Sequence, residues 1–266
     1  MIVPWPSSID LPYATSGFLV GTLVGMTGVG GGSLMTPILI LLFGVSPATA
    51  VGTDLLFAAA TKTVGSLVHG FNHTIDWRLV ARLASGSVPA TLLALLALYS
   101  LDMGGGGTRQ IITQILAVVL LFTAALLIMR ESIAARYAGR IGDLGERSIA
   151  LITIAMGATV GFLVTCSSVG AGAIGVTALL ILYPRLPAAR IVGSDIAHAV
   201  PLTLIAGLGH GAMGSIDLHT LGSLLVGSMP GIFFGSSISP RLPDLLVRYV
   251  LAAVLVAVAA RLLAYR

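Results

Sequence analysis

Apolar residues fill most of this chain in long runs that short polar linkers separate. Eight such runs cover residues 14–44, 48–70, 79–100, 109–129, 148–183, 188–210, 218–238 and 246–264. Six of them match the length of about 20 residues that one helix needs to cross a hydrocarbon core. The runs 14–44 and 148–183 are too long for one span and too short for two, and small residues interrupt each of them. The pattern predicts an all-α polytopic membrane protein in which these two runs bend.

The first long run contains a glycine cluster, Gly28-Val29-Gly30-Gly31-Gly32-Ser33. Glycine permits a sharp bend and leaves backbone N–H groups without helical partners. Inside a membrane such groups are tolerated only within protein or beside a wet cavity. We therefore predict a broken, V-shaped or re-entrant helical hairpin over 14–44, and a second one over 148–183 that bends at Thr165-Cys166-Ser167-Ser168.

The two halves of the chain resemble each other at a constant offset of 141 residues. The matching pairs are Gly52-Thr53-Asp54 with Gly193-Ser194-Asp195, His69-Gly70 with His210-Gly211, Ile75-Asp76 with Ile216-Asp217, and Gly86-Ser87-Val88-Pro89 with Gly227-Ser228-Met229-Pro230. A polar, arginine-containing linker lies between the halves. We predict a first membrane repeat over 1–129, a cytoplasmic linker over 130–147 and a second membrane repeat over 148–266.

The arginines are scattered between apolar runs, so the pI of about 9.6 indicates membrane topology rather than a nucleic-acid partner. The positive-inside rule places 71–78, 130–147 and 184–190 in the cytoplasm, and it leaves 44–48 and 211–217 outside. The run 148–183 must then enter and leave on one side. Each repeat becomes one hairpin plus three transmembrane helices, and the second repeat is inverted relative to the first. Inverted repeats with interrupted helices are typical of secondary transporters, with the site near the midplane.

Composition supports a multi-pass protein of the plasma or inner membrane, because 56% of the residues are hydrophobic and only 9% are charged. Cys166 is the only cysteine, which excludes a disulfide within the chain and a multi-cysteine metal cluster. The five histidines do not have the spacing of a tight ligand set. We expect no metal and no other cofactor.

The tips of the two hairpins are the first candidate site. Ser33 is placed to cap the outgoing arm of the first hairpin, and Ser167 or Ser168 that of the second. Two helix N-termini facing each other near the midplane would offer N–H donors and partial positive charge to an anion. The predicted substrate-binding residues are Gly30, Gly31, Gly32, Ser33, Lys62, Thr165, Cys166, Ser167, Ser168 and Gly170. As the alternative, these glycines only let helices cross closely.

Lys62 is the only lysine of the chain and lies well inside the run 48–70. An ionisable group at that depth is a functional candidate by default. Helical periodicity places Asp54 and His69 on the face of Lys62, and a similar stripe in the second half contains Asp195, His198 and His210. We predict that these five residues couple or gate transport; the aspartates could instead cap or pair near the interface.

Several of these segments resemble the TauE/SafE sulfite exporter family of membrane permeases. The resemblance rests on Gly28-Val29-Gly30-Gly31-Gly32-Ser33-Leu34-Met35-Thr36-Pro37, Ala50-Val51-Gly52-Thr53-Asp54, Gly161-Phe162-Leu163 and Ile191-Val192-Gly193-Ser194-Asp195. It spans nearly the whole chain, although Thr165-Cys166-Ser167-Ser168 departs from the glycine motif. It implies transport of small, often sulfur-containing anions such as sulfite, sulfonates or thiosulfate, coupled to a proton or anion gradient.

We therefore expect a secondary transporter of small anions rather than an enzyme. An anion channel is the nearest alternative. A membrane serine hydrolase would need Ser33 or Ser168 beside a histidine, but the sequence places His69 and His210 at the far ends of their spans. The expected partners are the anion and the lipid bilayer, without nucleic acid; a coupled proton, a homodimer and the direction of transport are left open.

Overall fold

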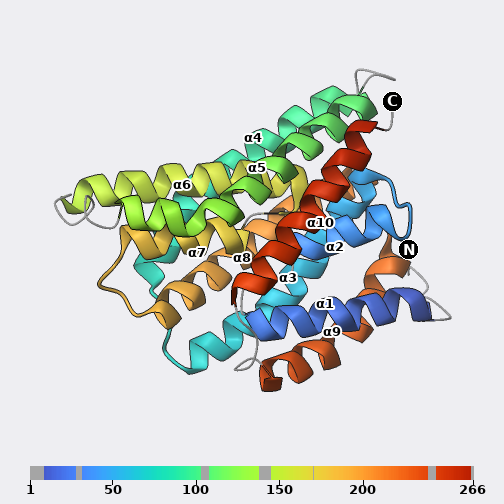
Figure 1. The fold of residues 1–266 in the computed structure, drawn as a ribbon. Helices are drawn as coiled ribbons and strands as arrows, with labels where there is room; N and C mark the ends of the chain where they lie inside the picture. Colours follow the sequence, from blue (N-terminus) through green and yellow to red (C-terminus); the bar gives the residue numbers. More distant parts are fainter. Residues whose placement is uncertain are drawn as a thin grey trace.

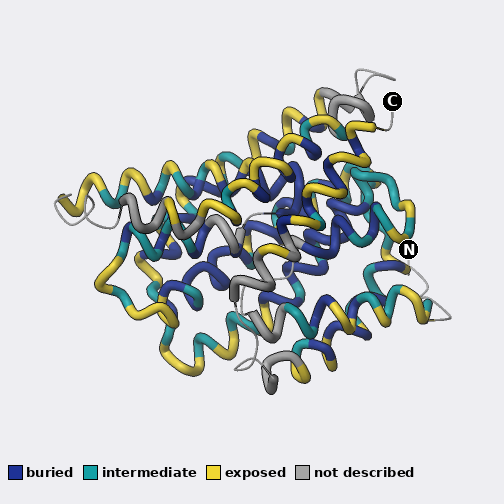
Figure 2. Tube along the Cα trace, in the orientation of Figure 1, coloured by how far each residue is buried: buried dark blue, intermediate teal, exposed yellow. Residues whose placement is uncertain are grey.

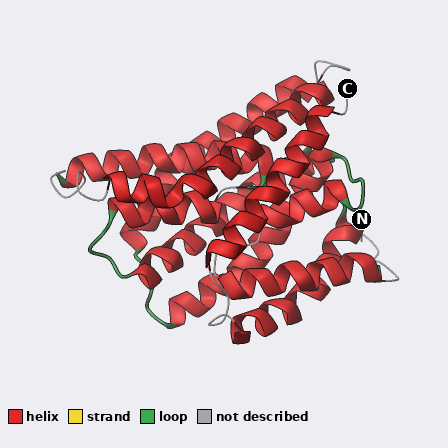
Figure 3. Cartoon of the chain, in the orientation of Figure 1, coloured by secondary structure: helices red, strands yellow, loops and turns green. Residues whose placement is uncertain are grey.

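The computed structural model describes residues 9–27, 32–102, 108–137, 145–169, 171–238 and 244–264, and within these ranges it contains ten α-helices and no strand (Figure 1 and Figure 3). The helices are α1 (Leu11–Thr27), α2 (Gly32–Leu41), α3 (Pro47–Phe71), α4 (Trp77–Asp102), α5 (Thr108–Tyr137), α6 (Glu146–Ser167), α7 (Ala171–Leu182), α8 (Ala188–Ala212), α9 (Leu218–Ile238) and α10 (Asp244–Ala264). The predicted all-helical class is confirmed.

Each of the two long apolar runs is divided into two helices, as predicted. The helices α1 and α2 occupy the run 14–44, and α6 and α7 occupy the run 148–183. The second break follows Ser167, where Ser168 takes a left-handed backbone conformation with φ of 58°. This position confirms the predicted bend at Thr165-Cys166-Ser167-Ser168. The first bend falls at 28–31, outside the described residues.

Contacts between their ends show that both hairpins return to the end at which they start. Tyr13 of α1 stacks on Phe43, just beyond α2, with ring centroids 4.3 Å apart. At the equivalent place in the second hairpin, the hydroxyl groups of Thr153 and Tyr183 lie 2.8 Å apart. The tip of the second hairpin lies about halfway along α4, because the Thr165 hydroxyl donates to Thr91 at 3.2 Å.

The connections between spans are fixed by matching aspartate caps. Asp76 accepts hydrogen bonds from the N–H groups of Arg78 and Leu79 where α4 begins. Asp217 does the same for the first turn of α9, accepting from the N–H groups of His219 and Thr220. Burial raises the pKa of Asp217, but the hydrogen bonds from Thr220 and His219 outweigh it and hold the pKa below its ordinary value. The ionised carboxylate is therefore the capping form.

Two pairs of helices approach so closely that glycine is required at the contact. A Cβ atom added to Gly161 of α6 would lie 2.5 Å from the carbonyl oxygen of Ser87 in α4. A Cβ atom added to Gly21 of α1 would lie 2.5 Å from the carbonyl oxygen of Ser228 in α9. Ser87 and Ser228 differ by the repeat offset, so the same contact is made twice. Each time, the incoming arm of one hairpin packs against a helix of the other half of the chain.

The helices α3 and α8 also correspond at the repeat offset, and they lie antiparallel to each other. The Asp76 N–H group, beyond the end of α3, donates to Ser194 near the start of α8 at 2.8 Å. Reciprocally, the Asp217 N–H group, beyond the end of α8, donates to Thr53 near the start of α3 at 3.0 Å. Corresponding helices that run in opposite directions are the geometry that an inverted repeat requires. The repeat boundaries and the membrane side of each loop stay predictions.

The loops gather at two opposite ends of the molecule. The α3–α4 connection, the start of α6 and the α7–α8 connection lie together at the left of Figure 1 and line one cavity. At the other end, residues 48 and 51 of α3 share a small cavity with residues 213 and 215 of the α8–α9 connection. These two groups match those that the positive-inside rule places on opposite sides of the membrane.

Burial follows the same arrangement, with the most continuous buried segments in the central helices α3 and α8 (Figure 2). The outer surfaces of the long helices carry exposed apolar side chains, among them Leu93 and Leu96 of α4 and Leu151 of α6. Within the described ranges, α4, α6 and α8 are long and apolar enough to cross a membrane. Exposed leucines on spanning helices are suited to lipid.

The first prediction tests the close contact between α4 and α6. Gly161→Ala should destabilise the protein by about 1–3 kcal/mol, because the added methyl group would overlap the Ser87 backbone. Gly65→Ala in α3 is the matched control, since its Cβ atom would only touch Ile196 at 3.4 Å. The measurement is the Tm of each purified variant in detergent. Equal Tm values for the two variants would contradict this close packing.

The second prediction tests which ends face opposite sides of the membrane. In a Cys166→Ser background, an impermeant thiol reagent applied to intact cells should label Ala212→Cys and spare Arg185→Cys, which reacts only after lysis. Both positions are exposed, at opposite ends of the molecule. Labelling of both from the same side would exclude the predicted topology.

Candidate functional site

Four ionisable residues lie together in the interior where α3 and α8 cross. We call Asp54 and Lys62 of α3, with Asp195 and His198 of α8, the buried charge cluster. Their exposed fractions are 0%, 6%, 2% and 1%, respectively. Ionisable groups inside a membrane protein are costly and mark functional sites by default. The crossing brings together four of the predicted candidates, two from each half of the chain.

Asp54 is held by α2, the outgoing arm of the first hairpin. Thr36 donates to the Oδ2 atom from its backbone N–H group at 3.1 Å and from its hydroxyl group at 2.6 Å. The Oδ1 atom is buried and has no hydrogen-bond partner among the described residues, and the same is true of the Ser168 hydroxyl. Ser168 lies close to the Asp54 carboxyl group. Two neighbouring buried oxygens without partners indicate a place for a proton, a water or a ligand.

Asp195 lies against α7, the outgoing arm of the second hairpin. A Cβ atom added to Gly175 would overlap the Oδ1 atom of Asp195. Glycine at this position therefore lets the carboxylate approach the α7 backbone. Each aspartate thus touches the outgoing arm in its own half of the chain, which relates the motion of each hairpin to one buried charge.

Lys62 lies between these two carboxylates in its electrostatic interactions. It attracts both Asp195 and Asp54, the former more strongly. Within the described part of the chain, the Lys62 amino group forms no ion pair with either carboxylate at 4.0 Å or less. Its positive charge is therefore shared rather than confined to one contact, which leaves N–H donors for another anion.

His198 completes the buried charge cluster and joins it to α4. Its Nε2 atom lies 2.8 Å from the Ser87 hydroxyl, and the two groups share a hydrogen bond. The charge of Lys62 also acts on His198. Because Ser87 belongs to the close contact between α4 and α6, His198 connects the buried charges with that helix pair.

The tip of the second hairpin differs from the prediction in one respect. Ser167 remains in α6 and donates from its hydroxyl group to the Leu163 carbonyl at 2.8 Å, while Ser168 forms the C-cap of α6. The outgoing helix α7 begins only at Ala171. The prediction that Ser167 or Ser168 caps the outgoing arm is therefore wrong, because both serines terminate the incoming one.

This correction also changes which backbone donors an anion could use. The N–H group of Ser168 donates to the Val164 carbonyl at 2.7 Å, and that of Val169 donates to the Ser167 hydroxyl at 3.1 Å. These two groups are not available to a substrate, contrary to the prediction. Gly170 lies outside the described residues, so the donors left for a substrate are those of the first turn of α7.

The first hairpin tip can be compared with the prediction only in part. Gly30 and Gly31 lie outside the described residues. The outgoing helix α2 begins at Gly32, so Ser33 belongs to its first turn and does not precede it as a cap. The side chains of Gly32 and Ser33 lie outside the described part, and the predicted roles of all four residues stay predictions.

Thr165 and Cys166 at the tip of the second hairpin are buried and point to different neighbours. The Thr165 hydroxyl donates to the Gly161 carbonyl at 2.7 Å, within α6. Cys166 lines a cavity of about 40 Å³ together with His210. That volume holds water but no organic substrate, so Cys166 faces a small wet space rather than the buried charge cluster.

The two remaining candidate histidines lie apart from the buried charge cluster. His69 forms a hydrogen bond through its Nδ1 atom to the Thr74 hydroxyl at 2.8 Å, beyond the end of α3. The Nε2 atom of His210 lies 2.9 Å from the Thr165 carbonyl oxygen, so it donates there. The prediction that His210 is far from the hairpin tip is wrong, because α6 reaches down to the end of α8. His210 binds a carbonyl, and the Ser168 hydroxyl has no partner, so no activated serine is formed there.

Two residues of this region were not among the predicted site residues. Thr36 supplies both hydrogen bonds to Asp54, and Ser87 binds His198. Both stand inside segments that the sequence analysis had singled out, the glycine-cluster segment and the repeated Gly86-Ser87-Val88-Pro89 motif. Their positions were visible, but their partners depend on how helices far apart in the chain cross.

Comparison with known proteins identifies the family. The profile of the family described as Sulfite exporter TauE/SafE matches residues 13–262. A protein of Bacillus subtilis named probable membrane transporter protein YjnA is 38% identical over 90% of this chain and 94% of its own length. A second B. subtilis protein, probable membrane transporter protein YdhB, is 23% identical over 87% of this chain and 91% of its own length.

A third relative, from Xylella fastidiosa, is named a probable membrane transporter protein and is 28% identical over 85% of this chain and 83% of its own length. No solved structure matches the chain significantly. The helical spans, the buried charges and the family match agree on a multi-pass membrane transporter rather than an enzyme. The chain belongs to the TauE/SafE sulfite exporter family.

Proposed function

We propose that this protein is a secondary transporter of small anions, with sulfur-containing anions such as sulfite, sulfonates and thiosulfate as the substrate class. The observation that carries the proposal is Lys62, a lone buried cation shared by Asp54 and Asp195 at the crossing of α3 and α8. The family description supports the choice of sulfur-containing anions. The names of the relatives support membrane transport in general.

The substrate binds between the outgoing arms of the hairpins, near Lys62. Both outgoing helices begin in the interior, where a helix N-terminus provides unpaired N–H donors and partial positive charge. Lys62 adds a full positive charge in surroundings of low dielectric constant, where its attraction for an anion is strong. Peptide donors hold the anion without a permanent countercharge at the same place, which favours its release.

The buried charges also favour coupling to protons. When both carboxylates are ionised and His198 is neutral, the buried charge cluster contains two negative charges and one positive charge. An anion that enters would raise the negative excess further, and uncompensated charge in the interior is costly. A proton that enters with the anion removes this excess. Asp54 is the better acceptor, since its Oδ1 atom has no hydrogen-bond partner among the described residues.

Alternating access uses the two close helix pairs. The pair α1–α9 and the pair α4–α6 each join one helix from each half of the chain, and α3 and α8 lie antiparallel at the centre. Tilting of these pairs about the α3–α8 crossing would open the site first to one side and then to the other. The reciprocal contacts support an inverted repeat as the basis of this exchange.

The third prediction concerns Lys62. Lys62→Met keeps the length of the side chain but removes its charge, so kcat/KM for substrate uptake should fall about tenfold or more, the effect of one lost charge-assisted hydrogen bond. The measurement is uptake of labelled sulfite, sulfoacetate and thiosulfate into proteoliposomes, with and without a pH gradient. A folded variant that transports at the normal rate would refute the site. Flux through the unmodified protein that neither saturates nor follows a gradient would favour an anion channel.

The fourth prediction separates coupling from transport. Asp54→Asn preserves an oxygen for the Thr36 hydrogen bonds but cannot release a proton. The variant should exchange substrate across the membrane at a rate similar to the unmodified protein, while accumulation driven by a pH gradient is lost. Asp217→Asn, at a helix cap outside the buried charge cluster, is the matched control and should retain accumulation. Gradient-driven accumulation by Asp54→Asn would show that the coupling proton is carried elsewhere.

A further inference from the structure

A second cavity, of about 340 Å³, lies at the end of the molecule where α4 and α6 begin and where α7 connects to α8. It is separate from the buried charge cluster. Its lining contains three arginines, Arg78, Arg82 and Arg185, together with two carboxylates, Asp76 and Glu146. Its volume lies in the range of sites for small molecules.

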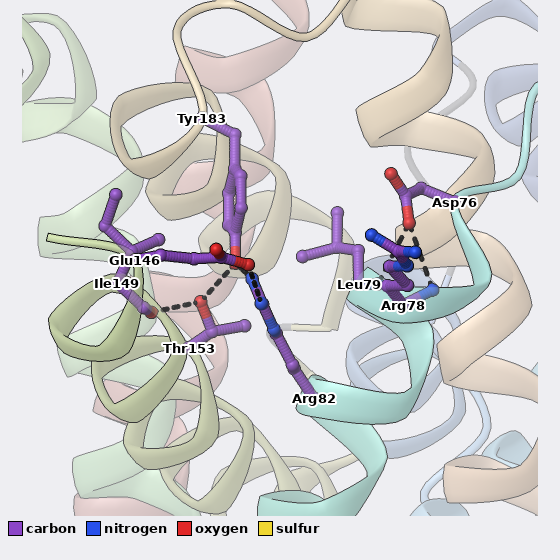
Figure 4. Close-up of polar contacts among 8 residues, drawn as sticks. All are labelled: Asp76, Arg78, Leu79, Arg82, Glu146, Ile149, Thr153 and Tyr183. Carbon is purple, nitrogen blue, oxygen red and sulfur yellow. Dashed lines mark hydrogen bonds and ion pairs between the residues drawn. The ribbon is translucent and has the colours of Figure 1, made fainter.

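One wall of this cavity is built around Arg82, which bridges three segments (Figure 4). Its guanidinium group donates to Glu146 at 2.9 Å and to the Tyr183 hydroxyl at 3.3 Å. Tyr183 in turn lies 2.8 Å from the Thr153 hydroxyl. These contacts join α4, α6 and the α7–α8 connection. They fix Arg82 in one place and use two of its five N–H donors.

Both carboxylates of the lining are already engaged. Glu146 pairs with Arg82, and Asp76 accepts the backbone N–H groups of Arg78 and Leu79 (Figure 4). The side chains of Arg78 and Arg185 form no ion pair at 4.0 Å or less with any described residue. The cavity therefore presents two uncommitted guanidinium groups beside apolar side chains, including those of Leu79, Leu182 and Leu186.

The chemistry of this lining selects one class of ligand. A guanidinium group binds carboxylate, sulfonate or phosphate oxygens through paired N–H donors. The leucines provide a surface for a short carbon chain. We propose that the cavity binds an organic oxyanion, with Arg78 and Arg185 as direct ligands and Arg82 as the positioning residue of the wall. The oxyanion could belong to a soluble organic acid or to the head group of an anionic lipid, since the cavity lies where spans end.

The other end of the molecule lacks this arrangement, although its helices correspond. At the repeat offset of 141 residues, the counterparts of Arg82 and Arg185 are Ser223 and Gly44, and that of Tyr183 is Leu42. Ser223 accepts a hydrogen bond from the Asp10 N–H group at 3.2 Å. The arginines are therefore not needed to hold the repeat together, and the cavity makes the two ends of the transporter chemically different.

The fifth prediction is tested by binding to the purified, delipidated full chain in a neutral detergent. The probes are sulfoacetate, by calorimetry, and dioleoylphosphatidylglycerol, by native mass spectrometry with phosphatidylcholine as the reference lipid. All variants are made in the Lys62→Met background, so the result does not depend on whether the central site of the proposed function exists. The test variant is Arg78→Gln with Arg185→Gln. The matched control is Arg190→Gln, an exposed arginine of α8 outside the cavity lining.

The test variant should bind at least one probe about tenfold or more weakly than its background, while the control binds as the background does. Loss of sulfoacetate binding identifies a soluble anion as the ligand, and selective loss of phosphatidylglycerol binding identifies a lipid head group. If the test variant proves unstable by Tm, Arg185→Gln alone, in an exposed connection, replaces it with the same expected direction. Equal binding by test variant and background, equal losses in the control, or binding of neither probe would overturn the proposal.

Discussion

The attraction between Lys62 and two carboxylates is the interaction on which the interior of this protein depends. Each of these charges alone would be expensive to bury in a membrane. Together they compensate one another in part, provided that α3 and α8 cross where Asp54, Lys62 and Asp195 meet. The reciprocal hydrogen bonds from Asp76 and Asp217 to the opposite helix hold this crossing in place. The same constraint leaves a cluster that is not neutral, and a transporter can use that imbalance.

Much of the fold could be predicted because the relevant signals are local. The apolar runs gave the spans, and the repeated Gly-x-Asp and Asp-containing turn motifs gave the correspondence between halves. The bend at Thr165-Cys166-Ser167-Ser168 was predicted correctly because a run of small polar residues inside an apolar segment interrupts a span. A match of sequence at one offset then recurs as a match of contacts, such as those of Gly161 with Ser87 and Gly21 with Ser228.

The errors have a common physical origin in contacts between distant segments. Ser167 was expected to begin a helix, but its hydroxyl group returns to the Leu163 carbonyl and keeps it in the preceding one. Serine can satisfy either end of a helix, so the choice depends on the backbone that follows. His210 was assigned to the far end of its span from spacing alone. Its bond to Thr165 exists because the second hairpin reaches deep beside α8, a depth that no local pattern encodes.

The close pairing of α1 with α9 has a consequence for how the protein is made. The glycine face of α1, including Gly17 and Gly21, is complementary to a helix near the other end of the chain. At a synthesis rate of about 5–20 residues per second, the roughly 200 residues between them take about 10–40 seconds to emerge. During that interval α1 must remain in the bilayer with its backbone-thin surface covered by lipid or by an insertion factor. A nascent chain halted before α9 would therefore expose an unmatched groove of small residues, a signal by which quality control can distinguish an unfinished transporter from a complete one.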